Sequence, residues 1–336
     1  MENLSQRTTQ ATATTPQITD SLGRVRKLIL DSLPNTSETL GQAAHHHFED
    51  SGKMMRAGLA ISTGACLGVD NRASESWAAA IELLHNASLV HDDISDGDTM
   101  RRDRPSIWAA YGRDTALALG DWMIALSFEH AARAATLSNE PRLVAILAER
   151  MKATTIGQAM EFELAGYTDW ARYCTIVGGK TAPLFVAPVE GMALISGRED
   201  LVVPVAAYFN AVGMAYQVSN DILNIIGADG AINPASALLR RAPNAVIICF
   251  RESLKNGTAM EFDKWLLSGD HKGAHDWHQR ILASEAIDTT IARMKDMLAA
   301  AESHAEAMPD TLKPVVMPIQ HLLGQICAQS MKHAAE

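Results

Sequence analysis

The strongest constraint on this chain is the spacing of its apolar residues. From residue 18 onward, Ala, Leu, Met and Ile recur three and four positions apart, and strict alternation of apolar and polar residues is nearly absent. That spacing places apolar side chains on one face of an α-helix. Hydrophobic residues make up 47% of the chain and charged residues 20%, so a sizeable core can be buried. Because no linker or internal repeat divides the chain, the sequence predicts an all-α protein with one large helical domain over residues 18–336.

The same periodicity predicts where the long helices lie. Ser74 is a good N-cap residue, so we expect one helix to begin there, and we interpret the apolar run Ala245–Phe250 as helix because nothing nearby can pair with it as a strand. Residues 1–17 are polar and rich in Thr and Ser, which predicts a disordered tail and not a signal peptide. The triplet His45–His47 points in three directions on a helix and is interpreted as a polar helix end, not a metal site. Long helices are expected at about 74–95, 115–136, 143–165, 169–196, 199–226 and 284–306.

Charge and cysteine usage exclude several classes of protein. The net charge of −10 argues against a nucleic-acid-binding protein, which normally shows a basic face. No apolar run approaches the roughly 20 residues that span a bilayer, so no transmembrane segment is expected. The cysteines are scattered without zinc-ligand spacing, and we expect reduced thiols in a cytoplasmic protein. They are Cys66, Cys174, Cys249 and Cys327.

The most informative motif closes the helix expected at about 74–95. Asp92 and Asp96 are four residues apart and therefore project from one helical face. Two stacked carboxylates repel each other unless a cation lies between them. Such hard oxygen ligands suit Mg²⁺, which completes its shell with water and substrate phosphates. The following pair Arg101-Arg102 can donate charge-assisted hydrogen bonds to the same substrate phosphates.

The segment HNASLVHDDISDGDTMRRDRPSIWAAYG, which starts at His85, resembles the first aspartate-rich motif of the trans-isoprenyl diphosphate synthases, or polyprenyl synthetases. The resemblance extends from about residue 40 to about residue 250 and includes several motifs in the family's order. It implies a helical bundle of the isoprenoid synthase type and a homodimer. It also implies a site that binds isopentenyl diphosphate and an allylic diphosphate (dimethylallyl, geranyl or farnesyl) through three Mg²⁺ ions.

The resemblance also assigns roles to individual residues. Gly52-Lys53-Met-Met-Arg56 is similar to the family's GKxxR loop, Lys180-Thr181 to its KT pair, and Tyr216-Gln217 to the aromatic-Gln pair beside its second metal motif. The implied substrate-binding residues are Lys53, Arg56, His85, Arg101, Arg102, Lys180 and Tyr216. The implied catalytic residues are Lys180, Thr181 and Gln217. The implied metal ligands are Asp92, Asp96, Asn220 and Asp221.

The chain departs from the family at the second metal motif. Where the family has DDxxD, the sequence reads Asn220-Asp221-Ile-Leu-Asn224. An Asn amide oxygen can still bind Mg²⁺, but it attracts the ion less than a carboxylate does. The Lys and Asp residues that the family carries farther on have no clear counterpart; Arg240 or Arg241 is a candidate substitute for a diphosphate-binding lysine. A smaller departure is Asp103, where the family favours Gly.

Product length is expected to depend on the helix that carries Asp92. Ala87 and Ser88, one turn before Asp92, are small where an aromatic residue in the family stops growth at fifteen carbons. Larger residues such as Leu84 lie farther from Asp92 on the same helix. The resemblance therefore implies geranylgeranyl diphosphate, with twenty carbons, as the main product.

The resemblance thus implies a Mg²⁺-dependent prenyltransferase that condenses an allylic diphosphate with isopentenyl diphosphate. Two alternatives stay open: a catalytically weak subunit that regulates a partner synthase, and a diphosphate-ionising enzyme similar to terpene cyclases. The degenerate second motif motivates both. Aromatic residues make up only 5% of the chain, which argues mildly against a cyclase, whose pocket shields cations with aromatic rings.

Overall fold

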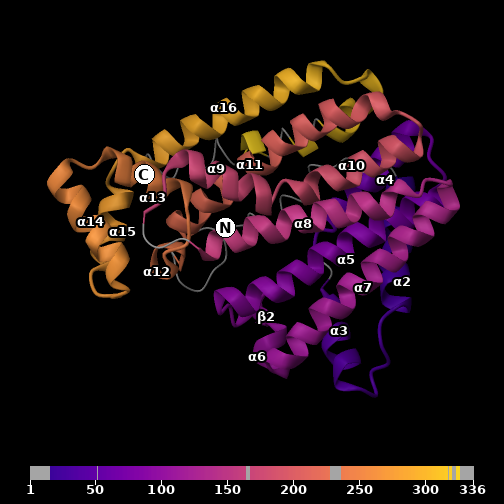
Figure 1. The fold of residues 1–336 in the computed structure, drawn as a ribbon, viewed down its shortest axis with the longest axis horizontal. Helices are drawn as coiled ribbons and strands as arrows, with labels where there is room; N and C mark the ends of the chain where they lie inside the picture. Colours follow the sequence, from indigo (N-terminus) through magenta and orange to yellow (C-terminus); the bar gives the residue numbers. More distant parts are fainter. Residues whose placement is uncertain are drawn as a thin grey trace.

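The fold is a bundle of long helices, shown in Figure 1. The computed structural model describes residues 16–50, 52–163, 167–227, 236–316, 318–319 and 323–325. The first half contains α2 (Pro16–Asp31), α3 (Thr39–Glu49), α4 (Met55–Leu67), α5 (Asn71–Asp96), α6 (Ile107–Tyr111), α7 (Arg113–Ser138) and α8 (Arg142–Phe162). The second half contains α9 (Trp170–Lys180), α10 (Pro183–Ile195), η2 (Glu199–Leu201), α11 (Val202–Ile226), α12 (Ser236–Arg240), α13 (Ala245–Ser253), α14 (Asn256–Ser268), α15 (Ala274–Leu282), α16 (Ala286–Glu306) and η3 (Asp310–Leu312). The predicted all-α class is confirmed.

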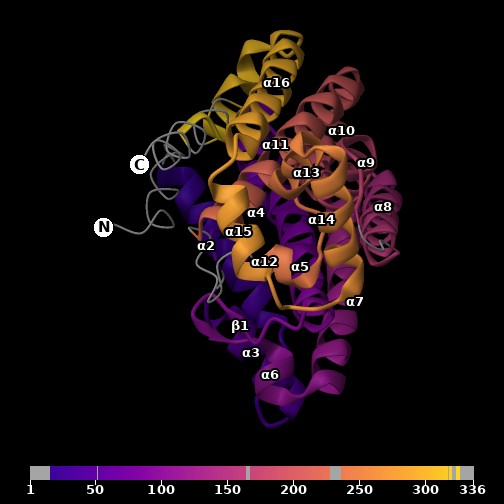
Figure 2. The ribbon, with the colours of Figure 1, turned by 90° about the vertical axis from the view of Figure 1, so that its left-hand side faces the viewer.

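The expected tail, residues 1–17, falls mostly on residues that are not described. Residues 1–15 lie outside the described part of the chain, whereas residues 16 and 17 open α2. The short helices α12 to α15 group at one end of the bundle (Figures 1 and 2).

Helix α10 lies between two apolar cores. Its residues are buried from Pro183 to Leu194, and a helix that is apolar all round is stable only inside a protein. Leu184 and Ala187 belong to the core shared with the first half of the chain, whereas Phe185 and Val186 belong to the core shared with the second half. Figure 1 shows α10 between α11 and α8. This helix therefore joins the two halves.

Helix α5 has clear start and stop signals. Asp70, not Ser74, caps it, because the Asp70 carboxylate accepts hydrogen bonds from the backbone N–H groups of Arg72 (2.9 Å) and Ala73 (3.3 Å). The predicted start is therefore wrong by about one turn of helix. The helix ends at Gly97, whose φ of 70° is the left-handed conformation that favours glycine. Asp92 and Asp96 lie in its last turns.

The helical region expected at 169–196 is interrupted where the KT pair lies. Helix α9 ends at Lys180 and α10 begins at Pro183. Proline has no N–H to donate to the carbonyl four residues earlier, so the helical hydrogen-bond ladder is broken here. The interpretation of Ala245–Phe250 as helix is confirmed by α13.

A small hairpin is a feature that helical periodicity does not reveal. Strands β1 (Met100–Arg101) and β2 (Arg104–Pro105) pair antiparallel. The two turn residues both have positive φ, 53° for Arg102 and 60° for Asp103. Positive φ at both positions defines the type I′ hairpin turn, in which Gly, Asn and Asp are favoured. The family's Gly at position 103 is thus replaced by a residue that tolerates the same conformation.

By length and composition, one described helical segment could cross a membrane. It is Glu199–Ile226, and 44% of an apolar 18-residue stretch within it is buried inside the structure. Val205, Tyr208 and Phe209 of this segment are fully or almost fully buried in the core shared with α16. A central helix of a large bundle has the same length and hydropathy.

Candidate active site

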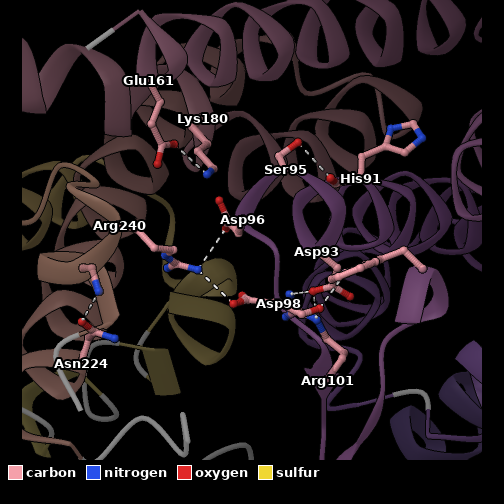
Figure 3. A network of polar contacts seen from close by, with 12 residues as sticks. His91, Asp93, Ser95, Asp96, Asp98, Arg101, Glu161, Lys180, Asn224 and Arg240 are labelled. Carbon is pink, nitrogen blue, oxygen red and sulfur yellow. Dashed lines mark hydrogen bonds and ion pairs between the residues drawn. The ribbon is translucent and has the colours of Figure 1, made fainter. Parts of the chain in front are cut away.

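The candidate site lies along one face of α5. Most of this helix is buried, but His85, Ser88, Leu89, Asp92 and Asp96 are partly exposed. These positions follow the spacing of one helical face. The partly exposed stripe contains both metal ligands expected in the first motif, and we call the space between this stripe and Lys180 the cleft (Figure 3).

Lys180 and Glu161 lie opposite Asp96 (Figure 3), and their charges also act on Asp92. Lys180 Nζ donates to Glu161 Oε2 at 2.7 Å. Burial opposes the charge of Lys180, but the carboxylates of Asp92, Glu161 and Asp96 outweigh it and raise the pKa of the ammonium. The predicted site residues include Lys180 but not Glu161. The cleft therefore holds three carboxylates around one lysine.

The close approach of α8 and α9 produces this arrangement. A Cβ placed on Gly157 would lie 2.3 Å from the backbone nitrogen of Lys180. Only glycine at this position lets the two helices come so near. Glu161, one turn after Gly157, consequently lies beside the Lys180 side chain.

The first aspartate motif fits a divalent cation. Burial raises the pKa of Asp92 to about 6, and the charges of Asp96 and Glu161 add to the effect while Lys180 opposes it. A cation would relieve this crowding of negative charge. Within the described residues, no three His, Cys, Asp or Glu side chains are grouped so that they could hold an ion alone. An ion on Asp92 and Asp96 would complete its shell with water and substrate oxygens, as Mg²⁺ does.

A second group of cations gathers around His85. Burial, together with the positive charges of Arg56, Arg102 and Arg101, holds the pKa of His85 well below its usual value. Arg56 lies over the ring of Phe185 at 4.8 Å, and its Nε atom is buried without a hydrogen-bond partner. Burial lowers the pKa of Lys53, which lies on the exposed loop before α4. An anion would satisfy the buried donor and reduce the repulsion between these cations.

Arg101 and Arg102 already have partners within the protein. Arg101 donates from Nε to the buried carboxylate of Asp93 at 2.9 Å and also contacts it through Nη2. Arg102 donates to the backbone oxygen of Asp50 and lies against Gly52, where a Cβ would come within 2.7 Å of the guanidinium. Both arginines are therefore fixed near His85. The middle aspartate of the motif, Asp93, serves as an anchor.

The histidine triplet differs from the sequence interpretation at its last member. His47 is buried and contacts the amide oxygen of Asn86 at 2.9 Å, so it is a core residue and not part of a polar helix end. His46 contacts the backbone oxygen of Pro105 at 2.9 Å. The triplet thus ties α3 to α5 and to the hairpin.

The second metal motif does not fit a metal ion as it stands. Asp221 is buried, and its carboxylate accepts hydrogen bonds from Tyr173 Oη (2.7 Å), the Ala245 N–H (2.8 Å) and Gln217 Nε2 (3.0 Å). Burial raises the pKa of Asp221 to about 6 despite these bonds. Asn220 is a partly exposed neutral side chain. Asp221, which the resemblance assigns to metal, is thus occupied in joining α9, α11 and α13.

Thr181 and Gln217 belong to the same network. Thr181 Oγ1 donates to Gln217 Oε1 at 3.4 Å, and Gln217 in turn donates to Asp221. Tyr216 packs against Phe185 with ring centroids 5.3 Å apart, which places it near Arg56. The structure therefore brings these three predicted residues together behind Lys180.

Arg240 and Arg241, the two candidate substitutes for a lysine, have different positions. Arg240 Nη1 lies 3.0 Å from Asp98 Oδ1 and 3.7 Å from Asp96 Oδ2, so it reaches the first motif (Figure 3). Arg241 donates to the backbone oxygens of Leu266 and Asp270 and stacks on Trp265. Arg240 is therefore the one that belongs to the site.

The expected chain-length residues lie on two faces of α5. Ser88 is on the partly exposed stripe, and its hydroxyl donates to the backbone oxygen of His85 at 2.7 Å. Ala87 and Leu84 are buried in the core of the first half of the chain. Ser88 is thus the one that faces the cleft directly.

Comparisons with known proteins agree with this arrangement. Residues 37–238 match the model of the polyprenyl synthetase family. A geranylgeranyl diphosphate synthase of Saccharolobus solfataricus is 29% identical over 218 residues, which cover 63% of this chain and 66% of that protein. A (2E,6E)-farnesyl diphosphate synthase of Mycobacterium tuberculosis is 36% identical over 186 residues, 52% of this chain and 50% of that protein. The matched stretch thus spans about two thirds or less of these relatives.

A solved structure extends the likeness to most of the fold. The polyprenyl synthase of Caulobacter crescentus, crystallised with calcium and isoprenyl diphosphate, superposes with a TM-score of 0.80 at 22% identity. The superposition covers 90% of this chain and 94% of that one. The likeness therefore includes the C-terminal helices, which the family match does not reach.

Proposed function

The chain belongs to the polyprenyl synthetase family, and on that premise we propose that it condenses an allylic diphosphate with isopentenyl diphosphate. The supporting observation is the pairing of two charged regions on α5. Asp92 and Asp96 face Lys180 at one end of the cleft stripe, and the cations around His85 lie about two turns earlier. One region suits a metal-bound diphosphate and the other suits a free one.

The reaction begins when the allylic carbon–oxygen bond breaks and leaves a carbocation and diphosphate. The double bond of isopentenyl diphosphate then attacks the cation, and a proton is lost to the departing diphosphate. Mg²⁺ bound to Asp92 and Asp96 would stabilise negative charge on the leaving group. Lys180 supplies a fixed ammonium at the same end of the cleft. Arg56, with Lys53 and Arg102, would hold the diphosphate of the attacking substrate so that its double bond points at the cation.

The direct test supplies purified protein with Mg²⁺, labelled isopentenyl diphosphate and, in turn, dimethylallyl, geranyl and farnesyl diphosphate. Labelled, elongated products support the proposal. Release of diphosphate without incorporation of the label would instead support the cyclase-like alternative. The matched control is Lys180→Met, which removes the ammonium at similar side-chain size and should abolish elongation.

A regulatory subunit is the second candidate, and the engaged carboxylate of Asp221 is the observation that favours it. A site that binds diphosphates but ionises them slowly would suit a subunit that modulates another synthase. This candidate predicts no elongation by the chain alone and altered product length when a second synthase is added. The same assay distinguishes it from the first proposal.

We extend the proposal to product and assembly. The small side chains of Ala87 and Ser88 favour geranylgeranyl diphosphate as the product, whereas relatives include synthases named for both geranylgeranyl and farnesyl diphosphate. A homodimer in the cytoplasm is the state expected for the family. Light scattering on the purified protein tests the dimer.

A further inference from the structure

The cleft wall opposite the first aspartate motif presents an arginine where the proposed function calls for metal-binding carboxylates. Both carboxylate oxygens of Asp221 accept hydrogen bonds, from Tyr173, Gln217 and the Ala245 N–H. Asn220 is neutral, and so is Asn224. The described residues of the second motif therefore offer no available carboxylate for a cation, and Glu161 on the same side of the cleft is paired with Lys180.

Arg240 occupies this wall and extends across the cleft. Its guanidinium contacts Asp98 (3.0 Å) and Asp96 (3.7 Å), which are more than 140 residues earlier in the chain. The three side chains are 33%, 42% and 30% exposed, respectively. Half-exposed ion pairs are weak because water competes for both charges. The guanidinium can therefore exchange its carboxylate partners for a stronger anion, such as a diphosphate.

Asn224, the last residue of the altered motif, fixes the element that carries Arg240. Its Oδ1 accepts a hydrogen bond from the Ala237 N–H at 3.2 Å, which ties the start of α12 to α11. Arg240 is the last residue of α12, and Figure 3 shows its side chain directed at Asp96 and Asp98. The amide provides this anchor without adding a negative charge that would attract the arginine away from the cleft. The Asn at position 224 and the Arg at position 240 thus act together.

We infer that Arg240 supplies, from the chain itself, the positive charge that metal on a second aspartate motif would bring, so that the leaving diphosphate is held between ions on Asp92 and Asp96 and the guanidinium of Arg240. A guanidinium suits this task because it offers paired donors to phosphate oxygens. The site accordingly takes fewer metal ions than the three expected from the resemblance. The inference rests on the proposed function only in taking a diphosphate as the ligand.

The test counts metal ions and measures affinity without turnover. The full-length protein is titrated with Mn²⁺ in the presence of inorganic diphosphate, and bound Mn²⁺ is counted by electron paramagnetic resonance. Wild-type protein should hold about two Mn²⁺ per chain. Arg240→Met should weaken diphosphate binding by about 10- to 100-fold, the range expected for lost hydrogen bonds to a charged group. Arg240→Lys should recover part of the loss.

Two further variants make the result specific. Arg198→Met removes another half-exposed arginine that is paired with an aspartate, Asp200, and should leave both readouts unchanged. Asn224→Ala keeps Arg240 but frees α12, so it should weaken diphosphate binding to a smaller extent. Asn220→Asp combined with Arg240→Met should raise the number of bound Mn²⁺ ions. Melting curves confirm that each variant is folded.

Three bound Mn²⁺ per wild-type chain, or wild-type affinity in folded Arg240→Met, would overturn the inference. Wild-type affinity for diphosphate in Asn224→Ala would show that Asn224 is not needed to hold Arg240 in place. Failure of the proposed function has a different signature, because a chain that forms no elongated product can still show the expected metal count and the expected loss in Arg240→Met.

Discussion

At the scale of single residues, Asp92 combines functional value with a structural cost. It is a partly buried carboxylate whose pKa burial raises to about 6, with Asp96 and Glu161 as negatively charged neighbours. We predict that Asp92→Ala lowers the turnover number by a factor of about 10³ or more, because it removes a ligand to the ion that stabilises the leaving group. The melting temperature should stay the same or rise, since burial and the neighbouring carboxylates disfavour the charge of Asp92 more than Lys180 favours it. Steady-state kinetics and calorimetry measure the two effects.

The control for Asp92 is Asp121→Ala on α7. That carboxylate is 78% exposed and forms an ion pair with His91 at 3.8 Å. Equal losses of activity in both variants, or wild-type turnover in Asp92→Ala, would contradict the metal assignment.

His47 is a second residue with a measurable consequence, in this case for stability. Burial lowers its pKa to about 4, and the bond to Asn86 only partly opposes this. Asn86 uses its amide nitrogen to donate to the Glu82 backbone oxygen, so its oxygen faces His47 and accepts the Nε2 proton. The native state therefore holds His47 neutral, while the unfolded chain takes up a proton as the pH falls through 6.5.

Protonation is linked to folding, and this linkage gives the direction in which stability changes with pH. A histidine whose folded pKa is depressed stabilises the protein above its unfolded pKa, and that contribution is lost as the pH falls from about 6.5 to about 4. Between pH 7 and pH 5 the loss from His47 should be about 2 kcal/mol. Urea unfolding of wild type and His47→Leu at both pH values gives the free energy of unfolding of each. The fall from pH 7 to pH 5 should be larger in wild type by this amount. Parallel pH dependences would show that His47 is not the group responsible.

At the scale of elements, the contact between α8 and α9 depends on glycine. A Cβ on Gly157 would lie 2.3 Å from a backbone nitrogen of α9, and backbone cannot rotate away as a side chain can. We predict that Gly157→Ala destabilises the protein by about 1–3 kcal/mol through overpacking. It should also separate Glu161 from Lys180 and so reduce activity.

A matched control lies on α9 itself. Gly178 has nothing within 4 Å of its would-be Cβ, and alanine favours the helix interior over glycine by about 0.5–1 kcal/mol. Gly178→Ala should therefore leave stability the same or higher. If chemical denaturation ranks the two variants in the opposite order, the packing explanation fails.

Helices were the easiest elements to predict, and their ends were the hardest. The periodicity that predicts α7 and α11 results from burial of one face over many residues, so one atypical residue does not hide it. The start of α5 depends on which side chain captures two N–H groups. Asp and Ser both favour the N-cap position, so residue type alone does not separate Asp70 from Ser74. The hairpin around Arg102 escaped prediction because its strands have only two residues each. Periodicity cannot be detected over such a length.

At the scale of the whole molecule, the site divides into a predictable part and a part that depends on distant contacts. Asp92 and Asp96 share one helix, so their relation follows from helical geometry alone. Whether Asp221 is free depends on Tyr173 and Ala245, which belong to two other helices and lie 48 and 24 residues away. The reach of Arg240 to Asp98 spans 142 residues. Such relations arise only when the helices pack, and no local pattern encodes them.

Product length is also a property of the whole molecule, because the growing tail must enter the interior from the cleft. Ser88 lies on the cleft stripe one turn before Asp92, whereas Ala87 is buried toward the core.

We predict that Ser88→Phe shortens the main product from twenty carbons to fifteen or fewer, with little loss of stability. Ala87→Phe should shorten it as well, but with overpacking that costs about 1–3 kcal/mol. Ser88→Ala is the control and should keep the wild-type product, since the hydroxyl bonds only within its own helix. Chromatography of the dephosphorylated products measures chain length. A wild-type product of fifteen carbons, or unchanged products in both Phe variants, would show that the tail does not pass this turn of α5.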